Sequence, residues 1–252
     1  MKCKLLILLS LLFIVMPVFA QPDIAALLKE AERLEPNNQE AAFAKYKELI
    51  KIKPTHVKAL YKCSELCSSI GHRQNSKDAR IDYYKAAKIY AQTALKIEPK
   101  NAEANFAMAV AMGRIALVAG GKEKINAVND IKKYAELSLL YDSTNFKPYH
   151  VLGKWYYEVS SLSNFERSAA KIFYGGLPPA SFKESIRFYE KSRQLAPDFV
   201  LNYLELAKAY YKDNEKDKAR QLLVTLLAMP NKVQDDTRIK QEAVLLQMEW
   251  KR

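Results

Sequence analysis

The most constraining feature of the chain is a phrase in which a helical stretch ends in an apolar residue, proline follows, and a helix-favouring stretch begins again. The phrase occurs as KIKPTHVKAL around Pro54, KIEPKNAEAN around Pro99 and QLAPDFVLNY around Pro197. A degenerate copy, LLYDSTNFKPYH, lies near Ser143. Because proline interrupts a helix interior, each copy predicts the end of one helix and the start of another. Helix pairs that recur in this way stack into a solenoid instead of folding around one cleft.

The residues between the prolines follow the tetratricopeptide pattern, in which small and large side chains alternate at helical spacing and proline closes the unit. The last unit fits best, with Tyr203, Leu206, Ala207 and Tyr210 on its first helix, Ala219, Leu223 and Leu226 on its second, and then Pro230. Only 7 glycines and abundant Ala, Leu, Lys and Glu also favour helix. We therefore predict an all-α fold, a tetratricopeptide-like α-solenoid of antiparallel helix pairs with elongated or inserted helices and a C-terminal capping helix.

The predicted units have unequal lengths within one domain, residues 21–252. They span approximately residues 22–54, 55–99, 100–143, 144–197 and 198–231, and an amphipathic cap covers residues 233–250. Terminal caps of this kind keep the open end of a repeat array from exposing apolar surface. The longest insertion, residues 163–180, contains a helix that ends at Gly175-Gly176. Ser181 and Glu184 then predict a capping box for the next helix.

The first twenty residues resemble a targeting segment. They combine a basic start, a short apolar core from Leu5 to Met16, and a small-residue cleavage signal ending at Ala20. The apolar core is shorter than the roughly 20 residues that a membrane span needs. We expect cleavage after Ala20 and an exported protein, periplasmic or secreted; the alternative is an uncleaved signal anchor.

The formal net charge is +12, and much of the basic excess falls within residues 51–100. Solvated helix faces explain it better than a nucleic-acid surface, because no nucleic-acid motif accompanies it. Cys63 and Cys67 lie one helical turn apart without further ligands nearby, which predicts buried thiols. We expect no metal, no cofactor and no nucleic acid. No constellation of catalytic residues is evident, so we predict that the protein is not an enzyme.

Residues 145–250 combine several motifs at particular spacings: His150, Leu152-Gly153, Trp155, Glu166-Arg167, Pro178-Pro179, Ser185 with Phe188, and the closing repeat. In this combination the segment resembles the regulator of microtubule dynamics family of tetratricopeptide proteins. The stretch from Gly121 to Tyr134 extends it, and the likeness covers roughly residues 78–250. The resemblance implies an all-helical scaffold without catalytic residues, associated in animals with microtubules, organelle contacts and, in places, lipids. An exported member does not meet cytoplasmic microtubules, so the family name then describes ancestry.

The first helix of each unit in such an array lines the concave face. The side chains that this register turns inward make a mildly basic, aromatic surface, and we take as candidate partner-binding residues Tyr61, Phe106, His150, Lys154, Tyr157, Leu204, Lys208 and Tyr211. The alternative is that the inserted helices fold across this face and make these residues core.

Two functions follow from these two readings. The first is a non-enzymatic scaffold that holds an unknown protein or peptide in an aromatic and basic groove. The second is an apolar-ligand binder in which the inserted helices enclose a cavity for a lipid tail, with a lipid or membrane surface as partner.

Overall fold

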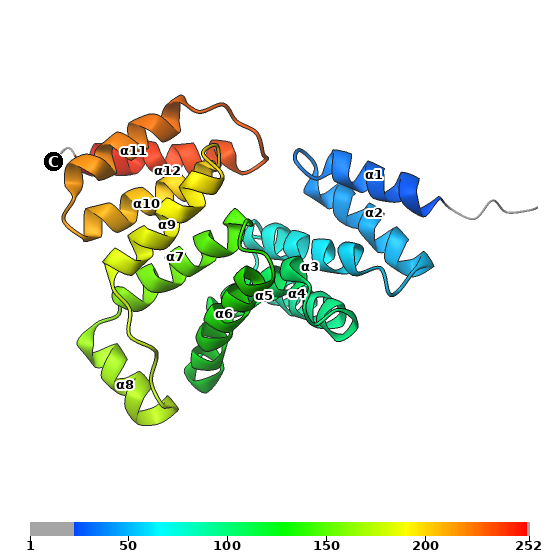
Figure 1. The fold of residues 1–252 in the computed structure, drawn as a ribbon, viewed down its shortest axis with the longest axis horizontal. Helices are drawn as coiled ribbons and strands as arrows, with labels where there is room; N and C mark the ends of the chain where they lie inside the picture. The colour runs from blue at the N-terminus through cyan, green and yellow to red at the C-terminus, as the bar shows by residue number, and fades with distance from the viewer. Residues whose placement is uncertain (1–22, 251–252) are drawn as a thin grey trace, which may run out of the picture.

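The computed structural model describes residues 23–250, and every regular element in that range is a helix (Figure 1). The helices are α1 (Ile24–Leu34), α2 (Gln39–Ile52), α3 (Val57–His72), α4 (Lys77–Ile97), α5 (Ala102–Ala116), α6 (Gly121–Tyr141), α7 (Phe146–Ser160), α8 (Asn164–Tyr174), α9 (Phe182–Leu195), α10 (Val200–Lys212), α11 (Lys216–Ala228) and α12 (Asp236–Glu249). The targeting segment expected in residues 1–20 lies outside the described residues.

The helices pack as antiparallel pairs that stack on one another. The pairs are α1 with α2, α3 with α4, α5 with α6, α7 with α9, and α10 with α11. The first helices α3, α5, α7 and α10 also contact one another in succession, whereas the second helices contact the next first helix. The first helices therefore form an inner layer, and α12 caps the array by packing on α10 and α11. The predicted tetratricopeptide-like solenoid with a capping helix is confirmed.

The boundary between pairs has the same backbone conformation whether or not proline is present. Lys53, Glu98 and Ala196 precede the prolines with φ between −129° and −138° and ψ between 81° and 86°. Proline explains these values, because its ring excludes the α conformation for the preceding residue. Asp142 takes φ −150° and ψ 96° without a following proline. Its carboxylate instead accepts hydrogen bonds from the Thr144 amide at 2.9 Å and hydroxyl at 2.6 Å, which fixes the turn.

Small residues allow the two helices of a pair to approach closely. A Cβ atom added to Gly153 in α7 would lie 2.6 Å from the Tyr189 ring of α9. Ser185 of α9 donates a hydrogen bond of 2.8 Å to the carbonyl oxygen of the same glycine. Tyr189 is fully buried, so its ring has nowhere to move. The crossing of α7 and α9 thus depends on the absence of a side chain at one position.

The inserted helix α8 packs against α6 and does not lie across the inner layer. It begins with a complete capping box between Ser163 and Glu166 and ends at Gly175, whose φ of 84° favours glycine. The capping box predicted for α9 is only half formed. The Ser181 hydroxyl accepts from the Glu184 amide at 3.2 Å, but the Glu184 carboxylate pairs with Arg187 at 2.7 Å. An arginine three residues away on the same helix face draws the carboxylate away from the cap.

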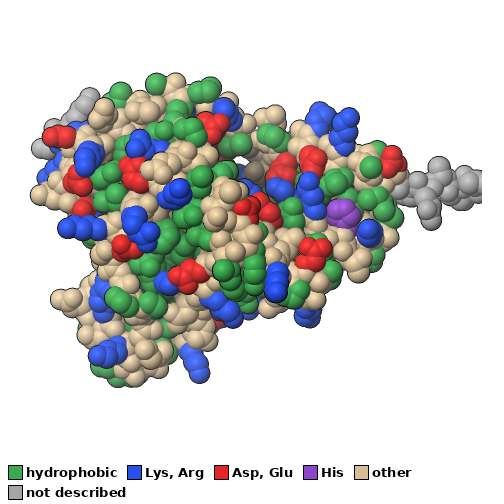
Figure 2. Space-filling model, viewed as in Figure 1, with side chains coloured by type: hydrophobic (Ala, Val, Ile, Leu, Met, Phe, Trp, Pro, Cys, Tyr) green, Lys and Arg blue, Asp and Glu red, His purple; other side chains and the backbone are tan. Residues whose placement is uncertain are grey.

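The two ends of the solenoid meet, which closes the array. The Gln234 amide, in the loop between α11 and α12, donates to the Pro36 carbonyl oxygen at 3.0 Å in the turn between α1 and α2. The side chain of Arg73, at the end of α3, pairs with both Glu40 at 2.9 Å and Asp235 at 3.5 Å. Figure 1 shows these two turns facing each other, and Figure 2 shows a hollow beside the contact.

The close crossing of α7 and α9 predicts opposite outcomes for two glycine substitutions. Gly153→Ala is expected to lower the free energy of unfolding by about 1–3 kcal/mol, because its methyl group overlaps the Tyr189 ring. Gly113→Ala in α5 is the matched control, since the nearest atom to its added Cβ lies 3.9 Å away. It should be neutral or stabilising by up to about 1 kcal/mol through helix propensity. Urea unfolding followed by circular dichroism measures both; equal effects would contradict the close-packing account.

Candidate functional site

Two networks of ion pairs lie on the inner layer and join different helix pairs. In the N-terminal network, Lys62 of α3 pairs with Glu35 at 2.7 Å, and Lys147 of α7 pairs with Glu103 of α5 at 3.2 Å. Glu65 lies between the two lysines, 3.7 Å from each. Burial alone would lower the pKa of Lys62, but the carboxylates of Glu65 and Glu35 raise it. This part of the face is therefore charged but balanced.

The second network of ion pairs, towards the C-terminus, is centred on the carboxylate of Glu205. Glu205 of α10 accepts from Lys154 of α7 at 2.7 Å and from Lys208 at 2.9 Å. Lys208 also pairs with Glu242 at 2.6 Å, which ties the capping helix to the array, and Lys154 pairs with Glu158 at 2.9 Å. Burial alone would raise the pKa of Glu205, but the two lysines outweigh it and lower the pKa to about 2. The carboxylate is ionised across the physiological range.

Three of the predicted partner-binding residues pack between helices instead of facing solvent. Leu204 is 1% exposed and belongs to the core around α10. Phe106 is 8% exposed, with the Lys147 ammonium 5.0 Å from its ring centre. His150 Nδ1 lies 3.0 Å from the Asn202 side-chain oxygen, and burial lowers the pKa of the imidazole. These residues hold neighbouring helix pairs together.

The other predicted residues are only partly buried, and four of them lie together. Lys154 and Lys208 share the carboxylate of Glu205, and the Lys154 ammonium lies 5.5 Å from the ring centre of Tyr157. The Tyr211 ring stacks on Trp250 at 4.1 Å, so the end of the cap covers it. These four residues lie on α7 and α10, and Tyr157 and Tyr211 pack against the same core cluster. Tyr61 lies apart, near the start of α3.

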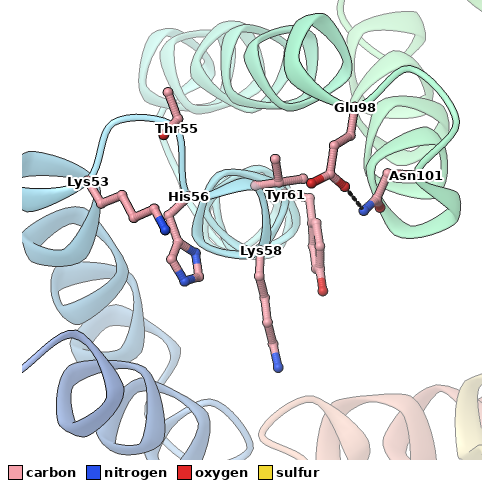
Figure 3. A pocket seen from close by; sticks show the side chains of 8 residues that line it. Lys53, Thr55, His56, Lys58, Tyr61, Glu98 and Asn101 are labelled. Carbon is pink, nitrogen blue, oxygen red and sulfur yellow. Dashed lines mark hydrogen bonds between the residues drawn. The ribbon is translucent and has the colours of Figure 1, made fainter.

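Tyr61 borders a shallow cleft with a volume of about 330 Å³ at the turns before α3 and α5 (Figure 3). The cleft is open to solvent, and the side chains that line it are mostly polar: Lys53, Thr55, His56, Val57, Lys58, Tyr61, Glu98 and Asn101. Figure 3 shows Asn101 directed at Glu98, to which it donates at 2.7 Å. A second open hollow of about 460 Å³ adjoins it at Glu98–Asn101. Neither hollow encloses an apolar volume that could hold a lipid tail.

The residues that organise this face were not identified as site residues from the sequence. Glu205 is the common partner of two lysines, and Asn202 holds His150. The spacing of Glu205 and Lys208 on one helix face was a usable signal for an ion pair. The pairing of Glu205 with Lys154 could not be predicted from spacing, because the two residues belong to different helix pairs.

Within residues 23–250 no group of three or more His, Cys, Asp or Glu side chains is placed to hold a metal ion. Cys63 and Cys67 are free and fully buried, and burial raises the pKa of Cys67 to about 12. They pack as small apolar side chains. In the same range, no helix is both long and apolar enough to cross a membrane.

Stacked helix pairs with an inner layer of first helices define the fold of a tetratricopeptide-repeat protein. A thermophilic tetratricopeptide protein of Thermus thermophilus has the same fold, with a TM-score of 0.65, 13% identity, and coverage of 88% of this chain and 99% of that one. PilF of Pseudomonas aeruginosa superposes with a TM-score of 0.53 at 13% identity, over 90% of this chain and 84% of its own.

The chain belongs to the regulator of microtubule dynamics protein 1-3 family, whose model matches residues 27–251. Regulator of microtubule dynamics protein 1 of Mus musculus is 26% identical over 175 residues, which is 69% of this chain and 57% of the mouse protein. The Caenorhabditis elegans protein of the same name is 26% identical over 180 residues, 71% of this chain and 77% of its own. The chain thus spans little more than half of the mouse relative. The family resemblance seen in the sequence is confirmed.

The buried carboxylate of Glu205 predicts a pH-dependent contribution to stability. Glu205→Gln should lower the free energy of unfolding at pH 7 by on the order of 2 kcal/mol, because two lysines lose their shared partner. The pKa of this carboxyl falls from 4.5 to about 2 on folding. Its contribution is therefore complete above about pH 5 and is lost as the pH falls towards 2. The difference between parent and variant should shrink over that interval.

Glu184→Gln is the matched control, because its carboxylate pairs with Arg187 on an exposed helix face. Exposed pairs contribute little, so its effect should stay below about 0.5 kcal/mol at every pH. Urea unfolding of the parent and both variants at pH 7 and pH 3 makes the comparison. A difference for Glu205→Gln that stays constant with pH would count against the ion-pair account.

Proposed function

We propose that this protein is a non-enzymatic scaffold that holds an extended segment of a partner protein along the inner layer of its solenoid. The support is the inner layer formed by α3, α5, α7 and α10, which the inserted helix leaves uncovered because α8 packs against α6. Partly exposed aromatic residues and charges line this surface, and such side chains commonly supply the energy of peptide binding. Tyr61 and Tyr157 are the accessible aromatic candidates.

On the inner layer the lysines are already paired with carboxylates, so a bound segment is not attracted by a net positive charge. It is recognised when its own oxygen atoms replace one of these internal carboxylates. Lys154 is 42% exposed although it already contacts Glu205 and Glu158. A carboxylate or carbonyl oxygen of a bound segment can replace the more exposed of these partners without leaving a buried charge unpaired. We therefore infer specificity from the positions of the charges, with aromatic contacts supplying much of the affinity.

Neither open hollow favours the lipid-tail alternative, because neither encloses an apolar volume. The family and the fold belong to a class that is typically non-enzymatic, and we extend that property to this chain. The start of the sequence, residues 1–20, supports export to the periplasm or the extracellular medium. The relatives are named for microtubule dynamics. An exported protein does not share a compartment with cytoplasmic microtubules, so its partner is a different protein.

Site-specific photo-crosslinking tests the proposed binding face. The full chain is produced in its cells of origin with p-benzoylphenylalanine in place of Tyr61 or Tyr157, which keeps an aromatic ring at each inner position. We expect both to crosslink to the same partner protein, identified by mass spectrometry.

Matched controls carry the photo-crosslinker on the second helices, at Ile89 of α4 or Leu140 of α6, which are 61% and 73% exposed. These positions should give no crosslink to that partner. Crosslinks obtained only from the second helices would reject the inner layer as the binding face.

A further inference from the structure

Positive charge gathers where the two ends of the solenoid meet. We call four arginines there the closure arginines: Arg73 after α3, Arg80 in α4, Arg114 in α5 and Arg238 in α12. Burial and the positive charges of the last three lower the pKa of His72, which ends α3. Asp235, which precedes α12, pairs with Arg73 at 3.5 Å and lies 4.0 Å from Arg238.

The nearby acidic groups already have partners. Glu40 pairs with Arg73 itself at 2.9 Å, and the Gln39 side-chain oxygen accepts from the same guanidinium at 2.8 Å. The carboxylate of Asp236 accepts from the amides of Lys232 at 2.7 Å and Val233 at 3.0 Å, so it fixes the loop before α12. Glu40 therefore neutralises Arg73, and Asp235 faces Arg73 and Arg238 only at the longer distances of 3.5 Å and 4.0 Å.

Two of the closure arginines have a buried N–H group that lacks a hydrogen-bond acceptor. The Nε atoms of Arg80 and Arg114 are buried and have no hydrogen-bond partner. Burial lowers the pKa of Arg114, and the charges of Asp235 and Arg238 both act on the same guanidinium. The lysines of the inner layer differ, because Lys62, Lys154 and Lys208 each have a carboxylate within 2.9 Å. Buried donors without partners are costly, which marks this place as suited to an anionic group.

We propose that the closure arginines bind an acidic segment of the partner protein, and that Asp235 of the chain itself occupies this site in the free protein. The proposal rests on the proposed scaffold function and names the chemistry of its partner. A glutamate or aspartate side chain is the fitting ligand, because guanidinium groups bind carboxylates through paired, charge-assisted hydrogen bonds.

The closure itself is weak enough to be displaced. It consists of the pairing of Arg73 with Asp235, the hydrogen bond from Gln234 to Pro36, and a long contact of 3.4 Å from the Gln39 amide to Gln234. The 3.5 Å between the Arg73 and Asp235 side chains is longer than a good charge-assisted hydrogen bond. An acidic segment that offers several carboxylates competes with the single one of Asp235. Binding of that segment and release of the α11–α12 loop are then coupled.

Fluorescence anisotropy with the folded full chain tests this proposal, with a labelled glutamate-rich peptide as the probe. Arg114→Gln should weaken binding about five- to tenfold, because one charge-assisted contact is lost. Asp235→Asn should tighten binding about threefold, because the internal competitor loses its charge. Net charge alone would change the affinity in the same two directions, so the comparison with an exposed charge at Lys85 decides whether the effect is local.

The controls separate a site from simple attraction between opposite charges. Lys85→Gln removes a positive charge from an exposed position of α4, the helix that carries Arg80, and should leave affinity within about twofold. A lysine-rich peptide of the same length should not bind. Circular dichroism establishes that each variant is folded, and Arg80→Gln replaces Arg114→Gln if the latter does not fold.

Unchanged affinity in Asp235→Asn and in the arginine variant would overturn the proposal, as would equal weakening by Lys85→Gln. The photo-crosslinks at Tyr61 and Tyr157 report on the scaffold function independently. If those crosslinks persist while the acidic peptide fails to discriminate the variants, the scaffold function stands and the acidic-partner inference falls. If the crosslinks are absent as well, both fail.

Discussion

The close approach of the two helices within a pair is the constraint on which the rest of the structure depends. At the crossing of α7 and α9, the backbone of Gly153 lies directly against the buried ring of Tyr189. This contact sets how near the helices come and how the next pair stacks on them. A solenoid lacks a single central hydrophobic core, and each unit is stabilised chiefly by its own packing and by its contacts with neighbouring units. Small errors in one crossing would therefore propagate to the inner layer.

Stacking of the pairs also decides which charges meet. Lys154 and Glu205 belong to different pairs, and they come within 2.7 Å only because α7 and α10 are neighbours in the inner layer. The result is a surface rich in charge but balanced along most of its length. The exception is the closure, where the donors of Arg80 and Arg114 lack partners. A scaffold with such a surface can combine broad contact along its face with selectivity concentrated at one place.

The fold could be predicted well because its signals are local. The prolines at 54, 99 and 197 fix the conformation of the preceding residue, and the turn at Asp142 reaches the same geometry through its own side chain. The candidate site was harder to predict. A position in the repeat register indicates which way a side chain points, but not what covers it. Leu204 is enclosed by the core around α10, and Tyr211 lies beneath Trp250 of the cap.

By itself, the sequence determined the helix pairs, their order, the inserted helix and the family, because each depends on spacing within a few turns of chain. Only the tertiary structure decided that α8 packs against α6, that Glu205 joins two lysines, and that the array closes on itself. The closure joins residues 195 positions apart, such as Gln39 and Gln234. No local pattern specifies such a contact, because it arises from the summed angles at which every intervening pair stacks on the next.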